Sequence, residues 1–308
     1  MRYFEMDLAF AAIGFVVANA VISLLTGLLW GAARRSRHSA GWLFRMRMAP
    51  AIGSASLVLG VIVPAFVSFE PRATSERAGP ALLGFIVVAG ILITAGWHRA
   101  FVSWRETRRL ERVWRAVAVR SVYPGIPVPA YRVPSNLPLA ALVGVVRPRL
   151  FVSDTFLDAL SADERQAVLD HEAGHLRSLD NLKRTLIKLA PDWLAFSSTG
   201  PELEAAWAIA AENDADDYAA GPGRARSLDL GSALLKASRM MPTRPVFASS
   251  FSDGAPIARR VERLLNDAPP HPGAVRTRAP RLTQSLVFWR FWLPRRCRRR
   301  RCSEPPTR

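Results

Sequence analysis

Long uncharged stretches dominate the first hundred residues of the chain and then give way to mixed polar and apolar spacing. Three stretches of 23, 19 and 20 residues carry no charged side chain: Leu8–Trp30, Ala51–Phe69 and Ala78–Trp97. At about 1.5 Å per residue, each is long enough to cross a hydrocarbon core roughly 30 Å thick. We therefore predict three transmembrane helices within residues 1–100. The first is too long for a signal-peptide core, so we expect it to be retained.

Arginine placement predicts the orientation of these spans. The loop after the first span carries five arginines and no acid: Arg34, Arg35, Arg37, Arg45 and Arg47. The charges balance at 70–77, and arginine is again in excess after Trp97. Because basic loops stay on the cytoplasmic side, we expect the amino terminus outside and the rest of the chain, after Trp97, in the cytosol. We therefore expect a multi-pass protein of the cell membrane.

The net charge of +17 comes almost wholly from arginine. Membrane topology and contact with anionic lipid explain it more simply than nucleic acid, so we expect no direct nucleic-acid partner. Both cysteines, Cys297 and Cys302, lie in a basic tail. A disulfide framework and a thiolate metal ligand are therefore not expected.

After the spans, the pattern predicts a mainly α fold with a small β part. An amphipathic helix at Trp104–Val119 should leave the membrane, and prolines interrupt residues 124–138. Short strands are expected at Ala140–Val146 and Arg149–Val152, and the stretch Leu150–Ser153 could pair with an extended substrate. Ser161 and Glu164 form a capping box that opens a helix. A second helix should cover about Pro201–Ala220 and end at Gly221-Pro222-Gly223.

The helix that starts at Ser161 carries the sequence His171-Glu172-Ala173-Gly174-His175. Two histidines four residues apart lie one turn apart on one helix face, where both imidazoles can bind a single metal ion. Glu172 can then act as general base on a water activated by zinc. This HExxH motif indicates a zinc peptidase.

Glu212 and Asp216 share one face of the following predicted helix. Two carboxylates side by side on an apolar helix repel each other unless a cation or an imidazole N–H compensates. We therefore expect Glu212 to be the third zinc ligand and Asp216 to accept a hydrogen bond from a ligating histidine. The alternative is a solvated acidic cluster, which we expect for Asp214 and Asp217. Tyr218, Arg224 and Arg226 are weak candidates for stabilising an oxyanion.

These motifs resemble the integral-membrane zinc peptidases of the BlaR/MecR antirepressor family, which is close to the HtpX and CAAX-protease group. The resemblance covers roughly Ser121–Asn266 and the hydrophobic amino-terminal half. It rests on RPRLFVS at 147–153, HEAGH, Asp180, the ExxAD of Glu212–Asp216 and IARRVERLL at 257–265. It implies a gluzincin fold with His171, His175 and Glu212 as ligands of one Zn²⁺ and Glu172 as base. It also implies Asp216 as partner of His171, and a structural or ligand-supporting role for Asp180.

The chain departs from that family at two points. Ala215 stands where these proteins typically have cysteine, a form nearer to HtpX. Only about 40 residues follow Asn266, so we expect no penicillin-binding sensor domain. The family's role in β-lactam sensing is therefore not carried over.

The expected organisation is a membrane region (1–100), a cytosolic zinc metallopeptidase domain (101–267) and a Pro/Arg-rich linker with a basic interfacial tail (268–308). The expected activity is endopeptidase cleavage of a protein or peptide substrate, either a transcriptional repressor or a membrane protein. A site-2-type intramembrane protease is one alternative, although charged residues flank the motif. A non-catalytic membrane scaffold or receptor with a vestigial zinc site is the other.

Overall fold

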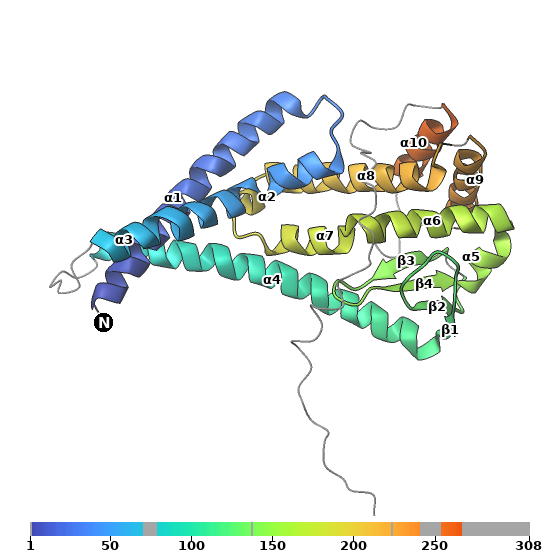
Figure 1. Ribbon diagram of the computed structural model, residues 1–308, viewed down its shortest axis with the longest axis horizontal. Helices are drawn as coiled ribbons and strands as arrows, with labels where there is room; N and C mark the ends of the chain where they lie inside the picture. Colours follow the sequence, from blue (N-terminus) through green and yellow to red (C-terminus); the bar gives the residue numbers. More distant parts are fainter. Residues whose placement is uncertain (1, 70–78, 137, 223, 241–253, 267–308) are drawn as a thin grey trace, which may run out of the picture. The chain divides into compact units, whose positions relative to one another are not determined.

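The computed structural model of the protein describes residues 2–69, 79–136, 138–222, 224–240 and 254–266. These residues form a mainly helical fold with one small sheet, as the sequence predicts (Figure 1). Three helices are long and apolar enough to cross a membrane: Met6–Ala33, Ala40–Phe69 and Pro80–Val117. The loop at 70–77 and the tail at 268–308, for which the sequence made predictions, lie outside the described residues.

The first apolar helix is α1 (Arg2–Ala33), and the second is built from three consecutive segments. It begins with α2 (Ala40–Leu57), passes through the π-helical η1 (Val58–Ile62) and ends with α3 (Val63–Phe69). Pro64 lies just after η1 and has no N–H to continue the α-helical hydrogen bonds, which accounts for the local π-helical turn. The third helix, α4 (Pro80–Val117), has proline at its start, where the missing N–H costs nothing.

Helix α4 also contains most of the predicted amphipathic segment. The sequence predicted an amphipathic helix at Trp104–Val119 that leaves the membrane, and in the structure this segment is the end of the third apolar helix, which runs without a break to Val117. The chain becomes extended at Ala118 and enters the sheet at Val119.

The sheet has four strands in the order β1-β2-β4-β3. Its strands are β1 (Val119–Ser121), β2 (Ala130–Val133), β3 (Ala140–Val143) and β4 (Arg149–Ser153). β2 and β4 pair in parallel, and the other two pairs are antiparallel. β4 is thus a central strand with both edges paired. The prediction that Leu150–Ser153 pairs with a substrate is therefore wrong, because its backbone groups already bind β2 and β3.

A run of helices follows the sheet along the chain. They are α5 (Asp154–Ala159), α6 (Ala162–Ser178), α7 (Asp180–Leu189), the short 3₁₀ helix η2 (Trp193–Phe196), α8 (Thr199–Ala220), α9 (Arg224–Met240) and α10 (Gly254–Leu265). Helix α6 contacts both the sheet strand β3 and helix α8, and Figure 1 shows α6 and α7 running one after the other beneath α8. Apolar residues of the sheet, α5, α6 and α9 form one core cluster.

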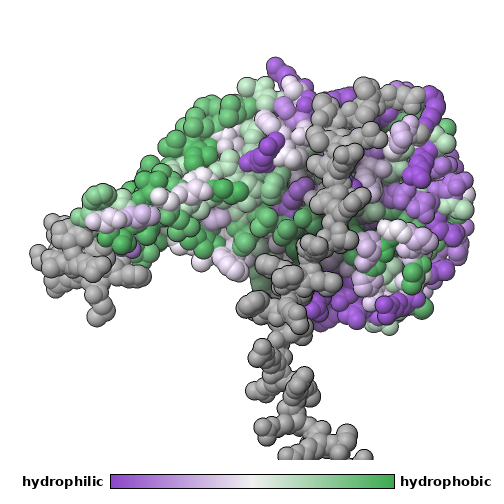
Figure 2. All heavy atoms as spheres, in the orientation of Figure 1, coloured by the Kyte–Doolittle hydropathy of each residue, from purple (hydrophilic) through white to green (hydrophobic). Residues whose placement is uncertain are grey.

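The apolar helices pack directly against the helices of the second half. A second core cluster joins Trp30 and Leu43, from α1 and α2, to Leu194, Leu203 and Trp207 of η2 and α8. All these contacts fall within one compact unit, Met1–Ala274. Figure 2 shows hydrophobic side chains gathered over α1–α3 and hydrophilic ones over the part formed by α6 and α9.

Candidate metal centre

Helix α6 places the two histidines of the HExxH sequence side by side. The predicted capping box is present: the Ser161 hydroxyl accepts from the Glu164 N–H, and the Glu164 carboxylate accepts from the Ser161 N–H. The N–H groups of Ser161 and Glu164 thus both have hydrogen-bond partners, which fixes where the helix begins. One turn apart on this helix, His171 and His175 bring their Nε2 atoms to 3.2 Å.

Helix α8 brings Glu212 to the same two nitrogens. Its carboxylate oxygens lie 3.6 Å from His171 Nε2 and 3.6 Å from His175 Nε2. The close approach of the helices depends on Gly174, where a Cβ atom would meet the Ala215 Cα of α8 at 3.1 Å. The glycine of the motif is thus the residue that lets α8 come near enough for Glu212 to reach both rings.

The geometry of these three side chains suits a small divalent cation. Tetrahedral zinc bonds histidine nitrogen at about 2.0–2.1 Å, which places its ligand atoms roughly 3.3 Å apart. The observed separations of 3.2, 3.6 and 3.6 Å bracket that value. Within the described ranges, His171, His175 and Glu212 make up the single group of three or more such side chains close enough to hold a metal ion.

Each histidine also faces an aspartate on the side away from Glu212. His171 Nδ1 lies 3.1 Å from Asp216, and His175 Nδ1 lies 2.8 Å from Asp180. Asp180 reaches His175 because Leu179 adopts a left-handed conformation (φ 56°) that ends α6 and starts α7. An aspartate that accepts the Nδ1 proton leaves the Nε2 lone pair for a cation. In their neutral form, both rings would therefore present an Nε2 lone pair toward Glu212.

Arg260 of α10 is a site residue that the sequence reasoning missed. Its guanidinium donates two hydrogen bonds to Asp216, at 2.9 and 2.6 Å, and lies 3.0 Å from Glu212. A signal was present in the sequence, since Arg260 falls on the face of α10 that also carries the buried Ile257, Val261 and Leu264. An arginine on an apolar helix face needs a buried acidic partner.

The charges of the cluster strongly perturb its titration. Burial would lower the pKa of His171, but Asp216 and Glu212 outweigh burial and raise that pKa to about 9. Burial would raise the pKa of Glu212, whereas His171 and Arg260 lower it to about 2. The pKa of Asp216 is also lowered, because Arg260 and His171 outweigh the effect of its burial. Both carboxylates are therefore charged at neutral pH.

Glu172 lies beside the two rings in a dry environment. Its side chain is buried, and this burial raises its pKa despite the opposing effect of His175 and His171. The Leu142 backbone N–H of strand β3 donates to its carboxylate. The carbonyl of Leu142 in turn accepts from the Asn181 amide at 2.9 Å, so the edge of β3 is tied to α6 and α7 at this point.

Some predicted residues have other partners. Asp217, which was expected to be solvated, is mostly buried and pairs with Arg263, which also lies 3.3 Å from Asp216. Arg226 pairs with Asp170 at 3.2 Å, and the Tyr218 ring lies beneath the Arg177 guanidinium. The acidic cluster of α8 is thus held largely by arginines of α10.

Comparison with known families agrees with this geometry. The family described as BlaR1 peptidase M56 matches residues 66–191, a stretch that includes the HExxH motif and ends before Glu212. Together with the three apolar helices, this match indicates a membrane-associated metallopeptidase. Over these residues it supports the similarity to the BlaR1/MecR-type family. No curated protein matches the chain.

Proposed function

We propose that this protein is a zinc endopeptidase of the cell membrane, with its active site in the cytosol. His171, His175 and Glu212 would hold one zinc ion per chain, and Glu172 would be the general base. The observation that carries the proposal is the convergence of two Nε2 atoms and a carboxylate at 3.2–3.6 Å, with an aspartate behind each ring.

Residues 1–100 would form the membrane region of this enzyme and 101–267 its peptidase domain. The substrate would be a protein, either a transcriptional repressor or a membrane protein. Helix α6 is not among the three helices that could cross a membrane in the described part of the chain. This favours a site beside the bilayer over one within it.

The residues around the site divide the chemistry between them. Zinc, when bound, supplies a Lewis acid that acidifies water and polarises the scissile carbonyl. A carboxylate oxygen of Glu172 accepts the proton of the attacking water and then passes it to the nitrogen of the leaving amine. Its raised pKa suits both steps, since the group must take up a proton and release it. Asp216 and Asp180 hold the orientation of the two imidazoles.

Glutamate-to-glutamine variants of the full-length protein in nanodiscs test this function. Glu172→Gln should keep one zinc per chain while cleavage of a randomised quenched-peptide library slows by roughly 10²–10⁴-fold. Glu212→Gln should lose the zinc. The matched control is Glu106→Gln, at an exposed position of α4, which should change neither. Normal cleavage by Glu172→Gln would refute its role as base, and wild-type protein without zinc would favour a scaffold.

A further inference from the structure

Among the completely buried polar side chains of the apolar helices, two bind the second half of the chain. Asn19 of α1 and Arg47 of α2 are both 0% exposed, and both bind the second half of the chain. Polar groups within apolar membrane helices are costly, and they persist where a partner satisfies them. Their partners in that half lie in the connection between α7 and α8 and in α8 itself.

Arg47 binds two carboxylates from different elements. It pairs with Asp192 at 2.6 Å, and neither side chain is exposed to solvent. It also donates to Glu204 of α8 at 3.1 and 3.3 Å. The other oxygen of Glu204 accepts from Lys188, near the end of α7, at 2.6 Å. A planar guanidinium with several donors is suited to bridging two carboxylates in this way.

Asn19 binds the backbone of the same connection. Its amide donates to the Pro191 carbonyl at 3.0 Å, and its carbonyl oxygen accepts from the Trp193 N–H at 3.2 Å. The amide also contacts the Ser54 hydroxyl of α2 at 3.1 Å. Asn19 thus joins α1, α2 and the α7–α8 connection at a single point.

The third apolar helix holds this connection as well. The Arg99 side chain of α4 donates to the Ala190 carbonyl at 2.7 Å. Gly96 of α4 packs so closely that a Cβ atom there would lie 2.4 Å from the Leu189 carbonyl oxygen. All three apolar helices therefore contact residues 189–193.

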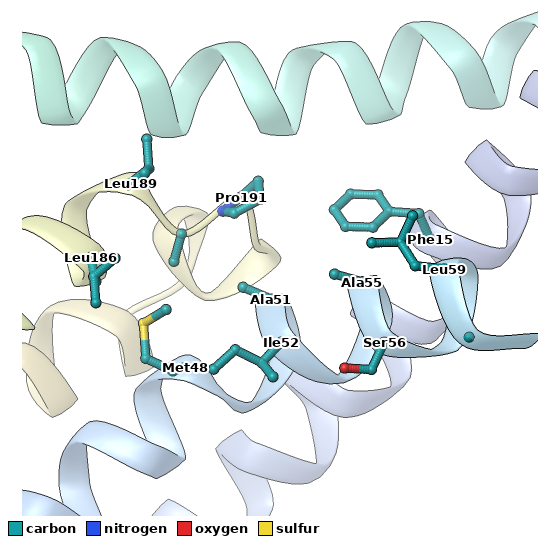
Figure 3. Close-up of a pocket in the computed structure, with 12 residues that line it drawn as sticks. Phe15, Met48, Ala51, Ile52, Ala55, Ser56, Leu59, Leu186, Leu189 and Pro191 are labelled. Carbon is teal, nitrogen blue, oxygen red and sulfur yellow. The ribbon is translucent and has the colours of Figure 1, made fainter. Parts of the chain in front are cut away.

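A cavity of about 650 Å³ opens between α2 and this connection (Figure 3), so their apolar contact is limited to buried residues such as Met48, Ala51 and Ala190. Met48, Ala51 and Ile52 line it from α2, and Leu189 and Pro191 line it from the opposite side. Arg47 directly precedes Met48. Beside the cavity, the polar contacts of Arg47 and Asn19 add directional links between the two sides to this packing.

The clamped connection joins two helices that both contribute to the candidate metal centre. Helix α7 begins with Asp180, which faces His175. Helix α8 carries Glu204 and, eight residues later and therefore about 12 Å along its axis, Glu212. A shift of the connection would displace both helices relative to α6.

We propose that Arg47 and Asn19 are positioning residues through which the membrane helices hold Glu212 and Asp180 against the two histidines. The membrane region is then part of the scaffold of the metal centre, and is more than an anchor. This inference rests on the proposed function.

The test uses the full-length protein in nanodiscs loaded with Co²⁺, whose visible absorption reports ligand number and geometry. Arg47→Met should weaken Co²⁺ affinity by roughly tenfold, the lower end of the effect seen for groups that support metal ligands, and should change the visible spectrum. Arg47→Lys should lose less Co²⁺ affinity than Arg47→Met but more than wild type, because an ammonium can still pair with one of the two carboxylates but does not bridge both as a guanidinium does. Asn19→Leu should act in the same direction as Arg47→Met. The matched control Arg45→Met, at an exposed position of α2, should behave as wild type.

A variant that leaves buried acids unpaired could fail to fold. The triple change Arg47→Met, Asp192→Asn and Glu204→Gln removes the clamp without leaving a fully buried unpaired charge, since Lys188, which loses Glu204, is partly exposed to solvent. This variant should fold yet still bind Co²⁺ more weakly. A wild-type spectrum and affinity in a folded Arg47→Met or triple variant would overturn the inference alone. Absence of Co²⁺ binding in wild type, or binding that survives Glu212→Gln unchanged, would overturn the proposed function and this inference with it.

Discussion

Arg260 gives the candidate metal centre a fixed positive charge behind its carboxylates. Glu212 and Asp216 lie one turn apart on α8, and both are charged because Arg260 and His171 lower their pKa values. Removing one member of a buried ion pair leaves an uncompensated charge, which typically costs about 3–5 kcal/mol. The guanidinium is therefore expected to stabilise α8 in the metal-free protein.

Arg260→Met should accordingly lower the free energy of unfolding of the metal-free protein by about 3–5 kcal/mol. Added zinc should restore part of this lost stability, because it neutralises the carboxylates. Chemical denaturation of the detergent-solubilised protein, with and without zinc, measures both effects. Arg259→Met is the matched control, because Arg259 is exposed on the same helix. An equal decrease in the free energy of unfolding of both variants would show that Arg260 does not stabilise the carboxylates of α8.

The pKa of His171 makes metal binding depend on pH. The folded, metal-free protein raises this pKa from 6.5 to about 9, so the ring is protonated at pH 7.5 and a metal must displace that proton. The proton stabilises the metal-free fold fully below pH 6.5, and this stabilisation is lost as the pH rises through about 9. Metal affinity should therefore increase with pH across this window.

Calorimetric titration with zinc at pH 7.5, in buffers of different ionisation enthalpy, should show release of about one proton per ion from His171, as expected for a ligand that must be deprotonated. The release should vanish above pH 9. Identical heats in all buffers at pH 7.5 would contradict a protonated His171.

The site residues that lie close together in the sequence were the ones that could be predicted most directly. His171, Glu172 and His175 lie within five residues on one helix, so helical periodicity alone brings them together. Glu212 and Asp216 could be found because carboxylates on an apolar helix need a partner. Arg260 could not be placed from local pattern, since its contact with Asp216 spans 44 residues and depends on how α10 packs on α8.

Among the elements, the contact between α4 and α7 depends on Gly96. Any side chain there would collide with the Leu189 carbonyl, which is backbone and cannot rotate away. Small residues at such positions let membrane helices approach closely. Gly90, on the same helix, has no atom within 4 Å of a built Cβ.

Gly96→Ala should therefore destabilise the protein by roughly 1–3 kcal/mol, the usual cost of overpacking, although alanine favours helix more than glycine. Gly90→Ala should be neutral or slightly stabilising. Thermal unfolding of both variants in the same detergent compares them. An unfolding temperature for Gly96→Ala equal to that of Gly90→Ala would mean that α4 and α7 are not in this close contact.

The helices of the fold were more predictable than its sheet. The capping box at Ser161 and the Gly-Pro-Gly at 221–223 mark helix ends in the sequence itself. In the structure, α6 begins directly after Ser161, and α8 ends at Ala220, directly before Gly221. Strand β1 precedes a proline-rich stretch and strand β2 lies within it, and neither was predicted. Strand order depends on pairing between distant segments, so the central position of β4 could not be derived from its own alternation.

For the whole molecule, the contacts relate the membrane helices to the candidate site. Trp30, near the end of α1, donates to Glu202 of α8 at 3.0 Å, and Arg47, near the start of α2, binds Asp192. Both lie close to the loop that contains Arg34, Arg35 and Arg37. We therefore expect this basic loop and the proposed peptidase to lie on the same side of a bilayer, and basic loops stay in the cytosol.

Reporter fusions can test this orientation. A fluorescent protein that folds only in the cytosol should fluoresce when fused after Ser36 or after Asn266, whereas alkaline phosphatase should be active only when fused within residues 70–78. Replacing Arg34, Arg35 and Arg37 with glutamine should weaken this bias, because the arginines, rather than apolar length, set the direction of insertion. Phosphatase activity after Ser36 would place the proposed peptidase outside the cell. A cytosolic repressor could then no longer be its substrate, whereas the metal centre itself would be unaffected.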